Sequence, residues 1–162
     1  IYPKFANQPI KEEYLLTDEL ETTNEFYALA KISGIKLCQA LKKQYNYNSI
    51  CLMPTNLYGP GDNYNLLNSH VIPGLIKKFI MAKENNSKFV KCWGSGNPLR
   101  EFLYVDDLAN ACIHILGKWN KSISDLPKDQ NSKDIYWLNV GSPYEISIKN
   151  INELNQHIGE VE

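Results

Sequence analysis

The chain has 162 residues, of which 43% are hydrophobic and 11% aromatic, and its net charge at pH 7 is -1. This length and apolar content are typical of a globular unit and argue against an intrinsically disordered chain. No stretch approaches the roughly 18 consecutive apolar residues of a membrane span, and the near-zero charge favours neither nucleic acid nor an anionic membrane as a partner.

Helix and strand patterns alternate along the chain. Residues 1–24 have the composition of a loop, a helix is predicted over 25–45, and the apolar run 49–53 predicts a buried strand. The later elements are a loop at 56–63, a helix over 71–84, a strand over 89–93, a turn at 94–98, an extended segment over 101–105, a helix over 106–116, a polar loop at 118–133, a strand over 135–141 and a helix from 147 to 158. This order predicts an α/β fold with a largely parallel sheet.

The first helix has apolar residues at helical spacing, which we expect to form its core face: Ala30, Ile35, Leu37, Cys38 and Leu41. The residues before it (Thr22, Thr23 and Asn24) offer N-caps, and Ser147 offers one for the last helix.

The cysteines indicate a reducing environment. Cys38, Cys51, Cys92 and Cys112 are scattered, without a CxxC pair or a His at ligand spacing. Reduced core thiols of a cytoplasmic protein are therefore favoured over a disulfide framework, and no metal site is expected.

Tyr27 and Lys31 are the first candidate for chemistry. They stand four residues apart on the predicted helix, so they share one face with about 6 Å of rise between them. An ammonium fixed beside a phenol favours its ionised form, which makes a tyrosine usable as a proton donor to a carbonyl being reduced. On its own, such a pair is more often solvated packing.

Three further motifs give this pair a context. They are Met-Pro-Thr-Asn-Leu-Tyr-Gly-Pro at 53–60, Asn-Ser-His-Val-Ile-Pro at 68–73, and the stretch from Trp93 to Asp107. In this order the segments resemble the extended short-chain dehydrogenase/reductase superfamily, and within it the GDP-L-fucose synthase family. The resemblance covers nearly the whole chain up to Gly141. The Tyr-xxx-Lys pair and residues 100–107 are common to the whole superfamily, whereas the motifs at 53–60 and 68–73 are specific to the family.

The resemblance implies a fold and a division of the chain. Residues 1–57, rejoined by about 101–117 and 134–141, would be the C-terminal part of a Rossmann-like parallel sheet with helices, which binds NADP(H). Residues 58–100 and 142–162 would form a smaller α/β substrate-binding portion. The family also implies a homodimer through the helix that carries Tyr27.

The resemblance further implies roles for individual residues. Tyr27 would protonate the C4 oxygen of a GDP-4-keto-6-deoxysugar as NADPH delivers hydride, and Lys31 would bind the nicotinamide ribose. His70 would be the acid and base of epimerisation and would also contact the cofactor. The nicotinamide site would be lined by Pro54, Thr55, Asn56 and Leu57, and the GDP-sugar would be held by Lys78, Trp93 and Arg100.

The chain also departs from the family pattern. The Gly-rich turn that cradles the cofactor pyrophosphate is absent, and Gly94-Ser95-Gly96 cannot replace it because no helix follows. The family's catalytic Ser and second epimerisation residue, a Cys, belong just before Ile1, and further substrate contacts belong beyond Glu162. We therefore expect an excerpt of a longer protein that does not turn over alone.

Plain structural readings remain open for several of these residues. His70 could be a histidine satisfied near a helix N-terminus, Arg100 could pair with Glu101 at the surface, and Trp93 could be a core anchor. Lys78 could belong to a solvated helix face, and Asp106 and Asp107 are assigned to helix capping.

Two other functions also remain open. One is another nucleotide-sugar epimerase or dehydratase of the extended family. The other is a non-catalytic module for nucleotide-sugar binding or dimerisation.

Overall fold

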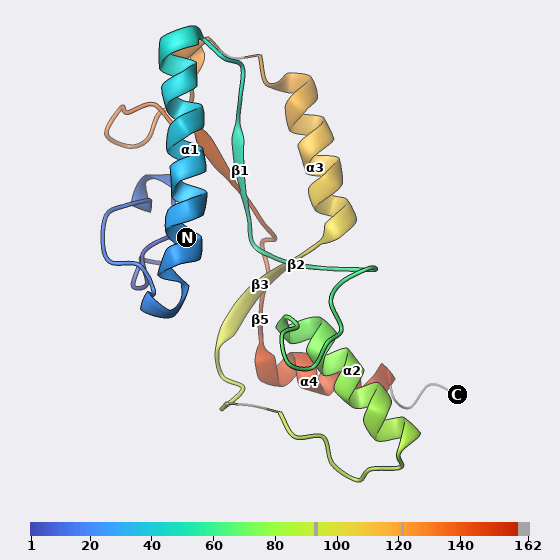
Figure 1. Cartoon of the computed structure of the whole chain (residues 1–162). Coiled ribbons are helices and arrows are strands. Elements are labelled where there is room, and N and C mark those ends of the chain that lie inside the picture. Colours follow the sequence, from blue (N-terminus) through green and yellow to red (C-terminus); the bar gives the residue numbers. More distant parts are fainter. Residues whose placement is uncertain (93, 121, 159–162) are drawn as a thin grey trace. The chain divides into compact units, whose positions relative to one another are not determined.

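The computed structural model describes residues 1–92, 94–120 and 122–158. The chain divides into two compact units (Figure 1). The first consists of Ile1–Met53 and Asn110–Val140, and the second of Pro54–Ala109 and Gly141–Glu162. The assignment of a cofactor portion and a substrate portion to the chain stays a prediction.

The first unit is built around one long helix and a small sheet. Helix α1 spans Glu25–Tyr45, as predicted, and strands β1 (Cys51–Pro54) and β4 (Trp137–Val140) pair with each other. Three short 3-10 helices lie in the loops: η1 (Glu12–Tyr14), η2 (Thr22–Asn24) and η3 (Ile123–Asp125).

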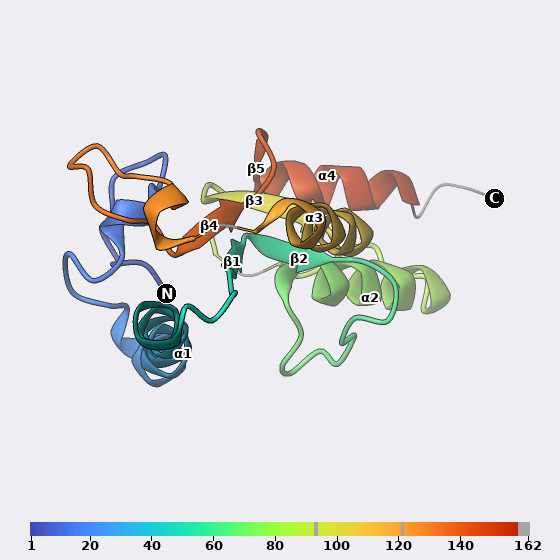
Figure 2. The ribbon, with the colours of Figure 1, turned by 90° about the horizontal axis from the view of Figure 1, so that it is seen from above.

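The core of this unit joins segments that are distant in the sequence. Its buried members are Leu15, Ile32, Ile35, Trp119, Leu126, Tyr136 and Trp137. The indole N–H of Trp119 donates to the carbonyl of Ser49 over 3.2 Å, and that of Trp137 donates to the carbonyl of Glu12 over 3.0 Å. Both buried indoles are therefore satisfied, and the N-terminal segment lies beside the loop that leads into β4 (Figure 2).

The core face of α1 differs from the predicted one. Its buried apolar residues are Ala28, Ile32 and Ile35, whereas Ala30 is exposed and Leu37 is 60% exposed. Each residue turns the helix by about 100°, so Ala30 and Leu37 point some 200° away from Ile32 and Ile35. Ile35 was predicted correctly, but Ala30 and Leu37 were wrong as core residues.

The second unit contains a three-stranded sheet and two helices. Strands β2 (Asn56–Tyr58), β3 (Leu99–Tyr104) and β5 (Glu145–Ser147) lie in the order β2-β3-β5, with β2 and β3 parallel and β3 and β5 antiparallel. Helices α2 (Val71–Glu84) and α4 (Ile148–Ile158) contact each other along one side of this unit (Figures 1 and 2). Helix α3 (Val105–Lys118) follows β3 directly.

The predicted bounds of α2 and the predicted cap of α4 are confirmed, whereas one predicted strand is wrong. Helix α2 has the predicted bounds, and the hydroxyl of Ser147 accepts the N–H of Asn150 over 3.1 Å at the start of α4. No strand forms at 89–92, where Phe89 is 87% exposed. The carbonyl of Lys91 accepts a bond from the Lys78 ammonium over 3.2 Å, and no strand of the described residues pairs with 89–92.

The packing of α1 gives a prediction for stability. Ile35 is 7% exposed, whereas Ile113 on α3 is 70% exposed. We expect Ile35→Ala to lower the free energy of unfolding by about 2–5 kcal/mol, because it removes buried methyl groups and leaves a cavity. The same change at Ile113 serves as the control and should stay within about 0.5 kcal/mol in urea titrations. Equal losses at both positions would contradict the assigned core face.

Tyr2 gives a prediction for pH dependence. Its hydroxyl donates to Asn139 Oδ1 over 2.6 Å, and burial, followed by the negative charge of Glu12, raises the pKa of Tyr2 from 10.0 to about 12. Below pH 10 the phenol is protonated in both states, so its contribution to stability is complete. Above that pH the unfolded chain releases the proton and the folded chain retains it, so stability falls as pH approaches 12.

Tyr2→Phe removes this titration, and denaturant unfolding at a series of pH values measures it. The difference in unfolding free energy between the two proteins should be constant at neutral pH and should shrink between pH 10 and about 12. A difference that stays constant across that range would show that the folded state does not hold the phenol protonated.

Candidate functional site

Helix α1 brings Tyr27 and Lys31 together. The Lys31 Nζ lies 5.5 Å from the centroid of the Tyr27 ring, and Tyr27 is 57% exposed. The predicted juxtaposition of phenol and ammonium on one helix face is therefore present. More than half of the Tyr27 surface is open to solvent.

The start of α1 is held by an ion pair. Lys4 Nζ lies 2.7 Å from the Glu21 carboxylate, which also accepts the N–H of Thr23 over 3.4 Å. The hydrogen bond from Lys4 is the main reason that the pKa of Glu21 lies below its usual value. The predicted cap at Asn24 occupies the N-cap position but makes no side-chain bond, so Glu21 caps the turn that leads into the helix.

Residues 54–57 pass from β1 into β2. The hydroxyl of Thr55 and the amide of Asn56 both donate to the carbonyl of Glu101, over 2.8 and 3.0 Å. Leu57 lies opposite Leu103 in the parallel register of β2 and β3. These contacts fix the backbone of the segment, while Pro54 and Asn56 stay exposed.

His70 is exposed and occupies the N-cap position of α2 without a side-chain capping bond. Within the described part of the chain, neither ring nitrogen makes a hydrogen bond, so the structure does not support the alternative of a satisfied capping histidine. Its main-chain carbonyl accepts the N–H of Gly74, and a side chain at Gly74 would meet the Ser69 hydroxyl at 2.7 Å. A larger residue at position 74 would therefore have to displace the Ser69 hydroxyl, which lies beside the turn that contains His70.

The loop before His70 is organised by asparagines. Asn63 bonds the side chain of Asn68 over 3.0 Å and accepts the N–H of Asn65, whose own side chain accepts the N–H of Leu67. The N–H of Ser69 donates to the carbonyl of Asn65 over 2.8 Å. Sequence reasoning missed this network, although the three asparagines at 63, 65 and 68 were a visible signal for turns held by side chains.

The residues that were predicted to bind the substrate make different contacts. Lys78 donates to the carbonyl of Lys91, which ties α2 to the segment that follows it. Arg100 on β3 is exposed and donates to the carbonyl of Leu99 over 2.7 Å. Trp93 lies outside the described residues.

Glu101 has a larger role than the sequence suggested. Instead of pairing with Arg100, its carboxylate accepts the N–H of Ser142 over 2.5 Å, while its carbonyl accepts Thr55 and Asn56. The interpretation of Arg100 and Glu101 as a surface pair is therefore not supported. Only the fold could reveal this role, because Ser142 lies 41 residues away in the chain.

The candidate residues fall into both units. Tyr27 and Lys31 belong to the first unit, and residues 54–57, His70, Lys78 and Arg100 to the second. Across the described ranges, no three His, Cys, Asp or Glu residues are grouped so that they could hold a metal ion. None of the helices in those ranges combines the length and apolar character needed to cross a membrane.

Comparisons with known proteins place these residues in context. Residues 1–125 match the model of the NAD dependent epimerase/dehydratase family. The chain is 49% identical over 158 residues to "Putative GDP-L-fucose synthase 2" of Arabidopsis thaliana, covering 98% of this chain and 44% of that protein. It is 45% identical over 161 residues to the GDP-L-fucose synthase of Escherichia coli K12, covering 99% of this chain and 48% of the relative.

A solved structure supports the same relationship. MlghC, described as a GDP-mannoheptose C4 reductase from Campylobacter jejuni with NADP bound, is 31% identical with a TM-score of 0.81, covering 98% of this chain and 54% of that one. The predicted α/β class with Rossmann-like relatives is confirmed. The chain spans about half the length of the curated relatives it matches.

Proposed function

Because the chain belongs to the NAD dependent epimerase/dehydratase family, we propose that its residues serve an NADPH-dependent 3,5-epimerase and 4-reductase acting on GDP-4-keto-6-deoxy-D-mannose. The product of these steps is GDP-L-fucose. The single observation that carries the proposal is the exposed Tyr27 phenol with the Lys31 ammonium 5.5 Å from its ring. The names of the relatives at 45–49% identity support the choice of substrate.

The Tyr27 and Lys31 pair fits the nicotinamide end of a cofactor. The ammonium has three N–H donors, which suit ribose hydroxyls, and the phenol is open to solvent beside it. NADPH, when bound, supplies the hydride that reduces C4 of the sugar. Tyr27 donates a proton to the C4 oxygen, and Lys31 holds the ribose.

Residues 54–57 form the second cofactor contact. The bonds from Thr55 and Asn56 to the carbonyl of Glu101 hold their backbone in one conformation, so Pro54 and Leu57 can present a fixed surface to the nicotinamide ring. In this proposal residues 1–57, rejoined by about 101–117 and 134–141, form the cofactor-binding portion. Residues 58–100 and 142–162 form the substrate-binding portion.

His70 serves the epimerisation. A proton alpha to a keto group is acidic enough for an imidazole to remove, and a histidine can return a proton near neutral pH. The exposed ring of His70, which makes no hydrogen bond within the described ranges, suits that exchange. In this proposal His70 also contacts the cofactor.

Lys78, Trp93 and Arg100 hold the GDP-sugar. Arg100 uses one N–H on the carbonyl of Leu99, and its remaining donors match the two oxygens of a diphosphate. Lys78 adds a positive charge on α2, and Trp93 packs against the nucleotide. The four cysteines are free thiols, which favours a cytoplasmic protein.

A homodimer through α1 is part of the proposal. The exposed face of this helix has Phe26 and Leu37 at 85% and 60% exposure, with Ala30 and Ser33 between them. The spacing of four, three and four residues places all of them on one stripe. Two large exposed apolar side chains separated by small ones suit the close approach of a second copy of the same helix.

The proposed chemistry is tested in a chimaera in which this chain replaces the matching 48% of the Escherichia coli relative. We expect it to oxidise NADPH in the presence of GDP-4-keto-6-deoxy-D-mannose. Tyr27→Phe should lower reduction by about 100-fold or more while retaining proton exchange at C3 and C5, because only the C4 step needs the phenol. His70→Asn should slow that exchange by a similar factor and spare reduction of an already epimerised ketone.

Matched controls are Tyr45→Phe on the same helix and His114→Asn on α3, both exposed side chains outside the proposed site. NADPH absorbance measures reduction, and incorporation of solvent deuterium measures exchange. Unchanged exchange in His70→Asn would remove the role of that residue. A folded chimaera that binds UDP-sugars in preference to GDP-sugars would instead favour another nucleotide-sugar enzyme.

The proposed dimer is tested with Leu37→Arg in the chain itself. We expect the wild type to sediment as a dimer and the variant as a monomer, because the substitution places two arginines at the contact between symmetry-related helices. Tyr45→Arg at the exposed end of α1 is the control and should stay dimeric. A monomeric wild type, or a Leu37→Arg protein that remains a dimer, would contradict the proposal.

A further inference from the structure

The first unit contains a cavity of about 770 Å³ that the proposed function does not use. It lies between α1, the segment around η1 and the loop before β4. Helix α1 contributes Lys36, Gln39 and Lys43, and β4 and the residue before it contribute Trp137 and Tyr136. None of the residues assigned to the proposed active site lines it.

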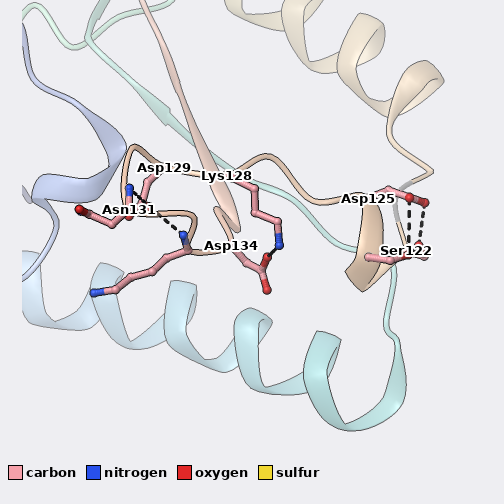
Figure 3. Close-up of polar contacts among 8 residues, drawn as sticks. Ser122, Asp125, Lys128, Asp129, Asn131 and Asp134 are labelled. Atoms are coloured by element: carbon pink, nitrogen blue, oxygen red, sulfur yellow. Dashed lines mark hydrogen bonds and ion pairs between the residues drawn. The ribbon is translucent and has the colours of Figure 1, made fainter.

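Most acidic side chains of this cavity are already engaged. Asp129 Oδ1 accepts the N–H groups of Asn131 and Lys133, each over 2.8 Å, and Asp134 forms an ion pair with Lys128 (Figure 3). These contacts fold the loop on itself.

The two glutamates at η1 are engaged as well. Glu12 Oε1 accepts the N–H of Asn139 over 2.9 Å, and Glu13 Oε2 accepts that of Gln130 over 3.4 Å. The other oxygen of Glu13 is buried away from solvent and makes no bond within the described residues. The carboxylates of Glu12, Glu13 and Asp129 keep their negative charges, but their hydrogen bonds go to main-chain N–H groups and not to the two lysines of α1.

Lys36 and Lys43 are the two lysines of α1 that line the cavity. They stand seven residues apart, so they lie on one face of α1. Lys36 Nζ lies 5.0 Å from the Trp137 ring centroid, and Lys43 Nζ lies 5.7 Å from that of Tyr136. Among the described residues, no carboxylate lies within ion-pair distance of either ammonium; Lys36 bonds the amide oxygen of Gln39 over 3.3 Å.

The electrostatics favour a bound anion. Burial, and then the positive charge of Lys43, lower the pKa of Lys36. Two ammonium groups that repel each other at the wall of a cavity gain most from a dianion, because a monoanion offsets only one of the two charges. The aromatic rings restrict where the ammonium groups can move.

We propose that this cavity binds a phosphate dianion between Lys36 and Lys43, as inorganic phosphate or as the end of a small phosphate ester. The volume is within the range of small-molecule sites and exceeds what phosphate alone fills. The polar side chains of Thr17, Gln39, Asn131 and Ser132 line the rest and suit the hydroxyls of an ester. The site is separate from the proposed active site and does not depend on the proposed function.

Isothermal titration of the chain at pH 7.5 and constant ionic strength tests the site, with inorganic phosphate and glucose 6-phosphate in separate arms. We expect saturable binding in at least one arm and none with acetate. Lys36→Gln and Lys43→Gln should each weaken binding by about tenfold or more, because each removes a charge-assisted bond. Lys36→Arg, which keeps the charge, should retain most of the affinity, and Lys88→Gln, exposed in the second unit, should leave it unchanged.

Tighter binding of glucose 6-phosphate would identify an ester as the ligand, and equal binding would identify phosphate alone. Circular dichroism of each variant confirms folding, and the NMR signal of the Lys36 side chain gives a second readout. Its pKa should rise when phosphate binds and when Lys43 is replaced by Gln. Absence of binding in both arms, or binding that is equal in Lys36→Gln and Lys88→Gln, would overturn the proposal.

Discussion

The candidate chemistry of this chain depends on the rotation of one helix about its own axis. The four-residue spacing places Tyr27 and Lys31 on the same helix face, and in this structure Lys31 Nζ lies 5.5 Å from the Tyr27 ring centroid. Which face of the helix is buried decides whether the two side chains reach solvent. Ala28, Ile32 and Ile35 turn toward the core, and this leaves the phenol more than half exposed. The same rotation exposes the stripe from Phe26 to Leu37, so the proposed proton donor and the proposed dimer contact have one structural cause.

In the second unit, Glu101 is the residue on which the local arrangement of the chain depends. A single residue of β3 accepts two side-chain donors from 55–56 on its carbonyl and a main-chain N–H from Ser142 on its carboxylate. The main-chain hydrogen bonds between β2 and β3 extend over only three residue pairs, so they hold the two strands together weakly. The side-chain bonds to Glu101 add to this pairing. The backbone of 54–57 is therefore fixed by contacts that are distant in the sequence.

Local signals made the helices predictable, whereas long-range pairing was not. The bounds of α1 and α2 and the cap at Ser147 follow from residues a few positions apart, so the sequence alone contains the information. The strand predicted at 89–93 had the right composition but lacks a partner at 89–92, and β5 was missed because three residues become a strand only through pairing with β3. The same limit applies to Glu101 and to the cavity beside Lys36.

The two units contribute different kinds of information about function. The Tyr27 and Lys31 pair suits any carbonyl reduction with a nicotinamide cofactor, so it cannot distinguish one sugar from another. A structure described as a GDP-mannoheptose C4 reductase superposes with a TM-score of 0.81, which shows that the fold is equally permissive. Discrimination must therefore come from other side chains, and in the proposed function His70, at the end of the asparagine-built loop, is one of them. Since each asparagine bonds the main chain or side chain of another loop residue, changes there would move the imidazole without touching α1.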